Sequence, residues 1–329
     1  MQVKPILVVQ GVKRIDEVPR LDELSDQAEI RCASSVDELR RMLPGAEVML
    51  GWNFRAASLR EAWSAVDNLR WIHWGGAGVD AALFDELANS DIQFTNARGV
   101  FDLPMAEWVL GMIIAFAKHF PETLACQARA EWQHRLSEKV AGKRALVVGV
   151  GSIGRAVGRL LTAVGMEVEA VGRSARDGDA DFGHVFGIDE LQQRLPTADY
   201  VVLITPLTEQ TRGLFGECEF AAMNPRARFI NIGRGPLVVE PALLAALHEG
   251  RIAGAALDVF VEEPLPPSSP FWSAPNCLVS PHMSGDYAEF EATMADQFVD
   301  NWRRYLAGEP MQNLVDKRLG FAARSAPGG

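Results

Sequence analysis

Three residues with complementary chemistry follow three separate apolar segments in the second half of the chain. Arg234 follows ARFINIG, Glu263 follows AALDVF, and His282 follows NCLVS. An arginine can bind a carboxylate through two parallel hydrogen bonds. A histidine can give a proton to a carbonyl oxygen as that oxygen gains negative charge, and a neighbouring glutamate favours the protonated imidazole. Together these side chains predict a site that binds a small carboxylic acid and protonates its keto oxygen.

These side chains can meet only if the segments before them are strands of one parallel sheet. From residue 144 onward, short apolar runs alternate with amphipathic stretches, which predicts a doubly wound α/β unit. In such sheets the loops at the carboxyl ends of the strands border the ligand crevice, so we expect the three side chains to converge there. The predicted strands are 144–150, 166–172, 199–205, 227–233, 255–260 and 276–281, and the predicted helices are 153–164, 189–194, 217–222 and 240–248.

A glycine-rich turn, GVGSIG (149–154), lies between the first predicted strand and the first predicted helix of this unit. Gly149 permits the tight turn, Gly151 lets the backbone approach a pyrophosphate, and Gly154 allows the helix to pack closely on the strand. The amides at the start of the helix then favour phosphate oxygens. This context predicts a dinucleotide site, and the alternative is a glycine turn without a ligand.

The end of the next predicted strand bears on the choice between NAD and NADP. NAD sites usually place an acidic residue there to bind the ribose. Here the strand ends at Gly172 and is followed by Arg173, Ser174 and Arg176, whereas the two glutamates of MEVEAVG lie inside the strand. A guanidinium can bind a 2′-phosphate, which a carboxylate would repel. We therefore expect NADP(H) to be preferred over NAD(H), and the alternative is that the two arginines are solvated loop charges.

The first hundred residues repeat the alternation of strands and helices. Predicted strands are 4–9, 46–51, 69–74 and 91–96, and predicted helices lie near 35–43, 56–66 and 80–89, the last with Asp80 as N-cap. A long apolar helix at 104–119 is expected to be buried between domains or subunits, and the amphipathic stretch at 286–306 to return to the first domain.

We predict an α/β protein with two doubly wound parallel-sheet domains and a cleft between them. Residues 1–99 plus 288–329 would form a flavodoxin-like substrate domain, and residues 100–287 a Rossmann dinucleotide-binding domain.

Composition excludes several other classes of function. A net charge of -11 disfavours binding to nucleic acid, and the chain has no apolar run of the roughly 18 residues that a membrane span requires. No metal site is expected, because the histidines lack ligand spacing and the cysteines form no CxxC pair. Well-separated cysteines also indicate a cytoplasmic protein without a disulfide framework. The four cysteines are Cys32, Cys126, Cys218 and Cys277.

Several stretches together resemble the D-isomer specific 2-hydroxyacid dehydrogenase family. They are GVGSIG, ITPLTEQT, NIGRG, ALDVFVEEPLP and SPHMSG, with GAGVD at 76–80 and NARG at 96–99, in the order and spacing of the family. The Gly-Arg-Ser at 172–174 and the stretch PLPPSSPFW are most similar to the glyoxylate/hydroxypyruvate reductase branch. The resemblance implies NADPH-dependent reduction of a small 2-keto acid, such as glyoxylate or hydroxypyruvate, to a D-2-hydroxy acid.

The resemblance also implies roles for individual positions. Arg234 would hold the substrate carboxylate and keto oxygen, and His282 would be the acid/base with Glu263 as its partner. The backbone amides of Ala77 and Gly78 would receive the substrate carboxylate. Residues implied to contact the cofactor, besides those already named, are Ser152, Ile153, Thr205, Pro206, Ile232, His282 and Asp258, the last through the nicotinamide carboxamide. The chain departs from many relatives before Ala106, where FDLPM lacks a threonine, and after His282, where Met-Ser replaces Ile-Gly.

Other proteins of the same fold are the alternatives. A phosphoglycerate dehydrogenase is disfavoured because no regulatory domain follows residue 316, and a formate dehydrogenase because its substrate has no carbonyl to protonate. A non-catalytic NAD(P)-sensing protein could keep the same three residues, although the acidic composition and the lack of an interaction tail disfavour it. The long apolar helix and the loop with Trp132 predict a homodimer, in which Trp132 packs at the interface or enters the neighbouring site.

Overall fold

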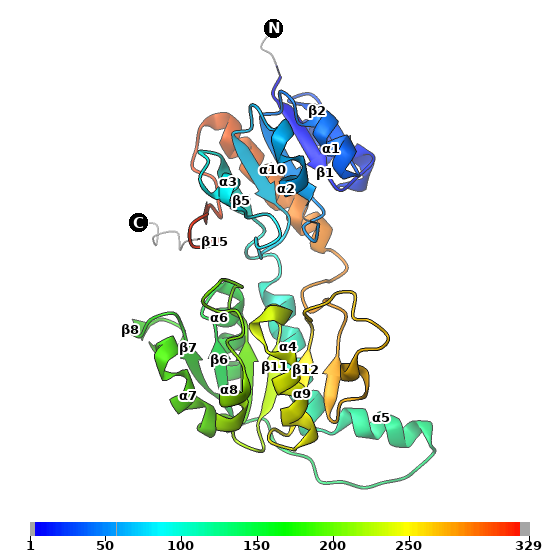
Figure 1. Ribbon diagram of the computed structural model, residues 1–329, viewed down its shortest axis with the longest axis vertical. Coiled ribbons are helices and arrows are strands. Elements are labelled where there is room, and N and C mark those ends of the chain that lie inside the picture. The colour runs from blue at the N-terminus through cyan, green and yellow to red at the C-terminus, as the bar shows by residue number, and fades with distance from the viewer. Residues whose placement is uncertain (1–3, 57, 323–329) are drawn as a thin grey trace. The chain divides into compact units, whose positions relative to one another are not determined.

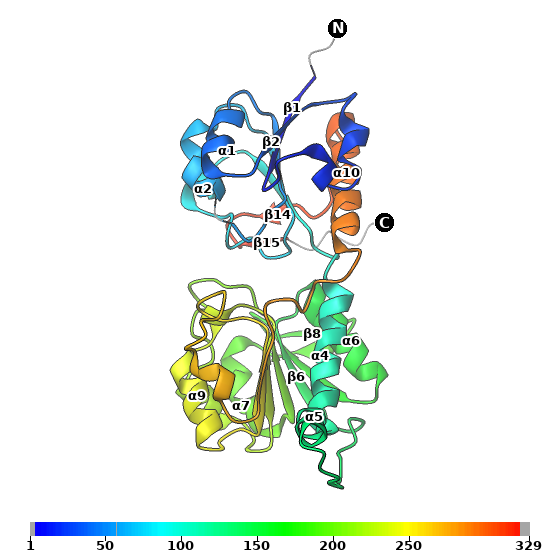
Figure 2. The same cartoon turned by 90° about the vertical axis from the view of Figure 1, so that its right-hand side faces the viewer.

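The computed structural model describes residues 4–56 and 58–322, which form two compact units. Unit 1 contains the residues up to Phe101 and those from Tyr287 onward, and unit 2 is Asp102–Asp286. Each unit has one fully parallel main sheet with helices packed on its faces (Figures 1 and 2). The expected α/β class is therefore confirmed.

Unit 1 is built on a five-stranded sheet in the order β2-β1-β3-β4-β5, which is the flavodoxin-like order. Its strands are β1 Ile6–Gln10, β2 Glu29–Ala33, β3 Val48–Gly51, β4 Trp71–Trp74 and β5 Gln93–Asn96, with a small β14–β15 pair at Val315–Asp316 and Phe321–Ala322. Its helices are α1 Val36–Met42, α2 Ser58–Ala62, α3 Asp85–Ala88 and α10 Phe290–Ala307, with 3-10 turns at Ile15–Glu17, Leu21–Leu24 and Trp63–Ala65.

One expectation for unit 1 needs correction, and one strand of its sheet was not predicted. The helix predicted near 80–89 is shorter, because α3 begins at Asp85 with Phe84 as its N-cap. Asp80 is therefore not the cap, and the residues before α3 form turns such as the one closed by Ala82 N and Val79 O. The edge strand β2 was not predicted, because only Ala33 of its five residues is buried and its sequence lacks a clear apolar alternation.

A histidine is enclosed in the core of unit 1. His73 on β4 is fully buried, beside the rings of Trp71 and Phe298. Its Nδ1 lies 2.8 Å from Thr95 Oγ1, which also accepts a hydrogen bond from Trp71 Nε1 at 2.9 Å. Burial lowers the pKa of His73 from 6.5 to about 3, because the charged imidazole would be cut off from water.

This buried histidine predicts a loss of stability in acid. Between pH 6.5 and 3 the unfolded chain binds a proton at His73 that the folded chain does not bind, so the unfolding free energy falls as pH falls. The slope is about 1.4 kcal/mol per pH unit inside that window. We expect His73→Leu to flatten the dependence when unfolding is followed by tryptophan fluorescence, and the exposed His248→Gln to leave it unchanged. An equal slope in wild type and His73→Leu would contradict the prediction.

Unit 2 is built on a six-stranded sheet in the order β13-β12-β11-β10-β6-β7. Its strands are β6 Arg144–Val148, β7 Glu167–Val171, β10 Tyr200–Leu203, β11 Arg228–Asn231, β12 Gly254–Leu257 and β13 Cys277–Val279, and a separate antiparallel hairpin pairs β8 Arg176–Asp179 with β9 Gly183–Val185. Its helices are α4 Asp102–Ala117, α5 Phe120–Ala128, α6 Ser152–Ala163, α7 Leu191–Arg194, α8 Glu217–Ala222 and α9 Glu240–His248, with 3-10 turns at Ile188–Glu190, Leu195–Thr197, Gly235–Leu237 and Pro270–Ser273.

The order of strands in unit 2 places a switch point beside β6. The chain continues from β6 to β7 on one side of it and later returns to β10 on the other side. In doubly wound sheets, ligands bind outside the carboxyl ends of the strands at such a point. The turn that follows β6 is GVGSIG, so the fold places the glycine turn at the position where a ligand is expected.

Helix α4 covers one face of this sheet together with α6 (Figure 2). Ala106, Val109 and Ile113 of α4 are buried in the same cluster as Val157 and Leu161 of α6. Part of the apolar surface of α4 is thus buried in the core of unit 2. Within the described residues no single helix is long and apolar enough to cross a membrane, although α4 and α5 together, bent by 63°, reach that length and composition.

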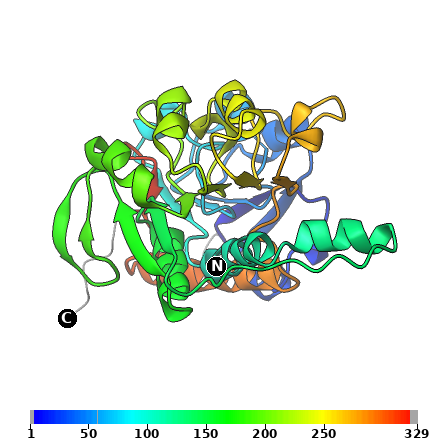
Figure 3. The same ribbon diagram turned by 90° about the horizontal axis from the view of Figure 1, so that it is seen from below.

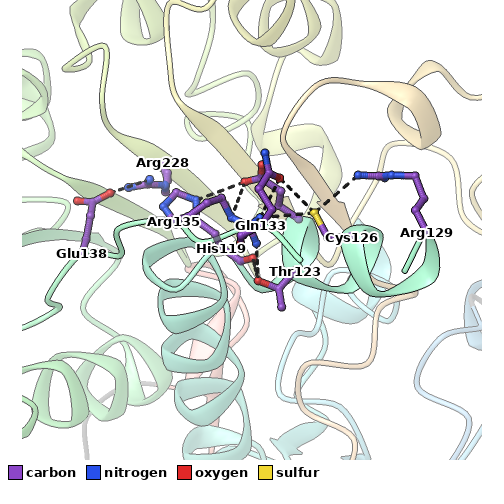
Figure 4. A network of polar contacts seen from close by, with 9 residues as sticks. His119, Thr123, Cys126, Arg129, Gln133, Arg135, Glu138 and Arg228 are labelled. Atoms are coloured by element: carbon purple, nitrogen blue, oxygen red, sulfur yellow. Dashed lines mark hydrogen bonds and ion pairs between the residues drawn. The ribbon is translucent and has the colours of Figure 1, made fainter. Parts of the chain in front are cut away.

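Helix α5 and residues 129–138 form an arm that projects from the rest of unit 2 (Figures 1 and 3). A polar network holds the arm in shape (Figure 4). Arg135 Nη2 donates to Thr123 Oγ1 at 2.7 Å, and its Nη1 donates to Gln133 Oε1 at 3.1 Å. The Cys126 thiol donates to the same Gln133 oxygen at 3.3 Å. These contacts shape a segment that buries little apolar surface of its own. The apolar side chains exposed on the arm are Phe120, Leu124, Trp132 and Leu136.

Candidate active site

The glycine turn between β6 and α6 has the geometry that its three glycines suggest. Gly149 has φ +119°, and a Cβ there would collide with the backbone of Ile204. A Cβ on Gly154 would collide with Gly149 O, so the first turn of α6 packs directly on the loop. A Cβ on Gly151 would meet only open space. Gly151 is the N-cap of α6, and because it has no side chain, the first amides of the helix receive no capping hydrogen bond from it. The start of α6, with Ser152 and Ile153 in its first turn, is therefore shaped to receive an anion.

The neighbouring strand supports a ligand at the same place. Ile204 follows β10, and its N–H donates to Val148 O at 2.8 Å, which aligns this strand end with the glycine turn. The hydroxyl of the next residue, Thr205, is buried and has no hydrogen-bond partner among the described residues. Pro206 is exposed beside it, whereas Ile232 after β11 is buried in the core. An open approach at Gly151 and an unsatisfied hydroxyl at Thr205 fit the phosphates and ribose of a dinucleotide.

Glu263 and His282 form a hydrogen-bonded pair. His282 Nδ1 lies 2.7 Å from Glu263 Oε2, and Glu263 Oε1 accepts the backbone N–H of Phe260 at 2.8 Å. Burial by itself would raise the pKa of Glu263, but the hydrogen bonds from His282 and Phe260 and the charges of His282 and Arg234 outweigh it and lower the pKa. Glu263 is therefore ionised at neutral pH and orients the imidazole.

The backbone around Arg234 explains why its loop lies against the loop that carries Glu263. A Cβ on Gly235 would collide with the backbone of Phe260, so only glycine allows these two loops to approach so closely. Arg234 Nη1 donates to Gly233 O at 2.8 Å, and the guanidinium lies near enough to Glu263 to influence its charge. Arg234 and Glu263 thus belong to one cluster at the carboxyl ends of β11 and β12.

Asp258 holds the segment that carries His282. It is fully buried, and its carboxylate accepts hydrogen bonds from Ser280 Oγ at 2.7 Å, Met283 N at 2.9 Å and Ser284 N at 3.0 Å. His282 has φ +52°, a conformation that most residues avoid and that this clamp stabilises. The expected contact of Asp258 with a nicotinamide carboxamide would have to share these oxygens, and it remains a prediction.

The two residues expected to bind a substrate carboxylate through backbone amides lie in unit 1. Ala77 and Gly78 are half-buried in the loop that follows β4. Asn96 at the end of β5 holds this loop, because its side-chain amide donates to Ala77 O at 2.6 Å. The ring of Phe54 lies against Gly76, at 3.0 Å from the position of an added Cβ. The loop is thereby held at the carboxyl end of the sheet of unit 1.

The residues expected to bind a 2′-phosphate follow β7. Arg173 and Ser174 are exposed just after the strand ends, whereas Arg176 begins β8 and is half-buried. The Nε and Nη2 atoms of Arg176 donate to Asp179 Oδ2 at 3.2 and 3.0 Å. Arg176 therefore differs from the other two, because a carboxylate already holds its guanidinium.

Sequence reasoning did not anticipate that two carboxylates support these groups, although it named Asp258 as a contact of the nicotinamide carboxamide. Asp258 clamps the segment with His282, and Asp179 pairs with both Arg176 and Arg155 of α6. The only signal for Asp179 was the acidic stretch DGDAD, which resembles an ordinary solvated loop. Within the described residues no cluster of histidine, cysteine or acidic side chains could hold a metal ion.

Comparison with known proteins identifies the family. The model of the D-isomer specific 2-hydroxyacid dehydrogenase NAD-binding domain matches residues 110–284. Glyoxylate/hydroxypyruvate reductase B of Citrobacter koseri is 34% identical over 245 residues, which cover 70% of this chain and 75% of that protein. D-3-phosphoglycerate dehydrogenase of Methanocaldococcus jannaschii is 28% identical over 92% of this chain, but the match spans only 57% of that longer protein.

A solved structure extends the likeness to 96% of the chain. The NADPH-dependent glyoxylate/hydroxypyruvate reductase of Sinorhizobium meliloti, in complex with NADP and sulfate, has a TM-score of 0.81 and 27% identity, and the match covers 96% of this chain and all of that one. The resemblance deduced from the motifs is thereby confirmed, and with it the expectation of a nicotinamide-dependent oxidoreductase. The chain belongs to the D-isomer specific 2-hydroxyacid dehydrogenase family.

Proposed function

We propose that this enzyme reduces small 2-keto acids, of the glyoxylate or hydroxypyruvate type, to D-2-hydroxy acids with NADPH. The observation that carries the proposal is the pair formed by His282 Nδ1 and Glu263 Oε2 at 2.7 Å, beside Arg234. A keto acid offers a carboxylate for an arginine and a carbonyl oxygen that needs a proton during reduction. The similarity to the reductases of Citrobacter koseri and Sinorhizobium meliloti supports the same class of substrate.

Each residue of the site would have a separate role in the reaction. The glycine turn at 149–154 and Thr205 would hold NADPH, which when bound would supply the hydride for the carbonyl carbon. His282 engages Glu263 through Nδ1, so Nε2 is the nitrogen that would hold the proton and give it to the carbonyl oxygen. Arg234 would bind the carboxylate and stabilise the negative charge that grows on the oxygen. Glu263 keeps the imidazole oriented, and the backbone amides of Ala77 and Gly78 are proposed to bind the substrate carboxylate.

The preference for NADP(H) rests on the residues after β7. Arg173 and Ser174 are exposed there, and the half-buried Arg176 lies beside them. No carboxylate occupies the positions directly after the strand, where an NAD-specific site would bind the ribose hydroxyls. The Sinorhizobium meliloti neighbour is described as NADPH-dependent and holds NADP, which supports the assignment.

We further propose that the enzyme acts as a homodimer in the cytoplasm. The arm carries four exposed large apolar side chains, among them the fully exposed Trp132, and exposed apolar side chains gathered on one segment indicate a protein partner. A second copy is the simplest partner, because most soluble oligomers are symmetric. A sedimentation mass of one chain at micromolar concentration would contradict the dimer. The free thiols of the four cysteines suit a reducing compartment.

A panel of 2-keto acids assayed with NADPH and NADH in parallel tests the function. We expect glyoxylate and hydroxypyruvate to be reduced with a higher kcat/KM than bulky 2-keto acids, and with NADPH preferred over NADH. Oxidation of 3-phosphoglycerate with NAD⁺ should be included, because a phosphoglycerate dehydrogenase is among the relatives. Turnover of that substrate alone would contradict the proposal, and binding of NADPH without any turnover would favour a sensing protein.

A further inference from the structure

The β8–β9 hairpin is fastened to the helix that begins at the glycine turn (Figure 1). The Phe182 ring, in the turn of the hairpin, packs against α6 at Gly158, where a Cβ would collide with it. Arg155 of α6 lies over the same ring, with its Cζ 5.7 Å from the centroid. Arg159 of α6 pairs with Asp181 of the hairpin at 3.0 Å. The hairpin is therefore joined to α6 by both apolar and charged contacts.

Asp179 is the centre of the charged contacts between these two elements. Its side chain is fully buried, and Arg155 donates to its two oxygens at 2.7 and 2.6 Å. Arg176 donates to Oδ2 through Nε and Nη2. Burial would raise the pKa of Asp179, but the hydrogen bonds from the two arginines outweigh it and lower the pKa to about 2. Asp179 is therefore ionised throughout the working range of pH.

These contacts fix the Arg176 guanidinium at the end of β7, next to the glycine turn. A Cβ on Gly172 would lie 3.5 Å from Arg176 Nη1 and 3.0 Å from a methyl group of Val150, the second residue of the turn. Gly172 therefore lies between the Arg176 guanidinium and the glycine turn, and it has no side chain that would hold them apart. The Nη1 atom lies on the side of the guanidinium that does not engage Asp179 in the hydrogen bonds above.

The cluster keeps a positive charge although it contains carboxylates. Arg155, Arg159 and Arg176 outnumber Asp179 and Asp181, which leaves one positive charge in excess. Arg173, exposed at the strand end, adds another positive charge, and Asp177 of the same hairpin, which pairs with His184, removes one. In a chain with a net charge of -11, this is local positive charge at the adenosine end of the glycine-turn site. Arg155 balances Asp179, so Asp179 can hold Arg176 without cancelling its charge.

We propose that Asp179 is a positioning residue for cofactor selectivity, which holds the Arg176 guanidinium where the 2′-phosphate of NADP(H) binds. The proposal rests on the NADP(H) preference in the proposed function. Arg176 is a long side chain with many rotamers, and fixing it in advance lowers the entropy lost when it binds the phosphate. Without Asp179, Arg176 would keep its charge but would have to be ordered by the ligand.

Two small probes that differ only in the 2′-phosphate test this role. The affinities of the full chain for 2′,5′-ADP and 5′-AMP are measured by calorimetry, and their ratio reports the preference for the 2′-phosphate. We expect Asp179→Asn to lower this ratio about tenfold, or about 1.4 kcal/mol, while the affinity for 5′-AMP stays within twofold. Asp177→Asn is the matched control, because Asp177 is an exposed carboxylate of the same hairpin that pairs with His184, and it should not change the ratio.

A double-mutant cycle separates positioning from a general effect. Arg176→Gln should also lower the ratio, and Asp179→Asn added to Arg176→Gln should lower it no further, because Asp179 acts through Arg176. Additive losses would overturn the proposal, as would an unchanged or increased preference in Asp179→Asn. If Asp179→Asn does not fold, Arg176→Lys is measured in its place. This variant keeps the charge but loses the planar guanidinium that Asp179 holds. An undiminished preference for 2′,5′-ADP over 5′-AMP in this variant would overturn the proposal. Equal wild-type affinities for both probes would instead contradict the NADP(H) preference itself.

Discussion

His282→Asn is expected to lower kcat for the reduction of glyoxylate or hydroxypyruvate by about 10²–10⁴-fold. The asparagine can still donate a hydrogen bond to Glu263, but its amide is too weak an acid to transfer a proton to the carbonyl oxygen. Binding of NADPH should be retained, because the glycine turn and Thr205 are not altered. Single-turnover measurement of NADPH oxidation checks the prediction, and a rate within threefold of the wild type would remove His282 from the chemistry.

The pH dependence should have opposite signs in the two directions of the reaction. Reduction requires the protonated imidazole, so its kcat/KM should fall as pH rises. Oxidation of the D-2-hydroxy acid requires the neutral imidazole, so its kcat/KM should fall as pH decreases. The lowered pKa of Glu263 keeps this carboxylate ionised across the neutral range, so it stays charged beside the imidazole in both directions of the reaction. A flat reductive profile between about pH 6 and pH 10, under conditions where chemistry limits the rate, would contradict this role of His282.

Arg234→Ala is expected to lower kcat/KM for 2-keto acids by about 10²–10³-fold, through both a higher KM and a lower kcat. The guanidinium is expected to bind the carboxylate in the ground state and to stabilise the oxyanion as it forms, so both parameters should change. Arg234→Lys keeps the charge without the two-pronged geometry and should lie between the alanine variant and the wild type.

The control for Arg234 is the integrity of its loop. Arg234 Nη1 also donates to Gly233 O, so a loss of activity could come from a displaced backbone. Unchanged thermal unfolding and unchanged affinity for NADPH in Arg234→Ala would assign the loss to the missing guanidinium. Activity within threefold of the wild type toward every 2-keto acid of the panel would show that the substrate carboxylate binds elsewhere.

Sequence patterns alone determined the class of the fold and the family. The apolar runs before Arg234, Glu263 and His282 are strands β11 to β13, because buried parallel strands are continuous apolar segments that local sequence reveals. The spacing of GVGSIG likewise depends on local backbone geometry, since Gly149 and Gly154 are required by contacts within one turn and its neighbouring strand. The order of strands then determines which loops meet at the carboxyl end of the sheet.

Tertiary structure decided the features that local patterns do not contain. Helix α5 buries only Cys126, so its sequence has no stripe of core-facing residues from which the helix could be predicted. The β8–β9 hairpin is held by ion pairs of Arg155 with Asp179 and Asp181, 24 and 26 residues away. Such pairs have no period along the chain, and the same residues in a solvated loop would produce an identical sequence. Apolar periodicity is therefore enough to predict the main strands and the side chains that follow them. The supporting carboxylates Asp258 and Asp179 acquire their partners only when distant segments pack together.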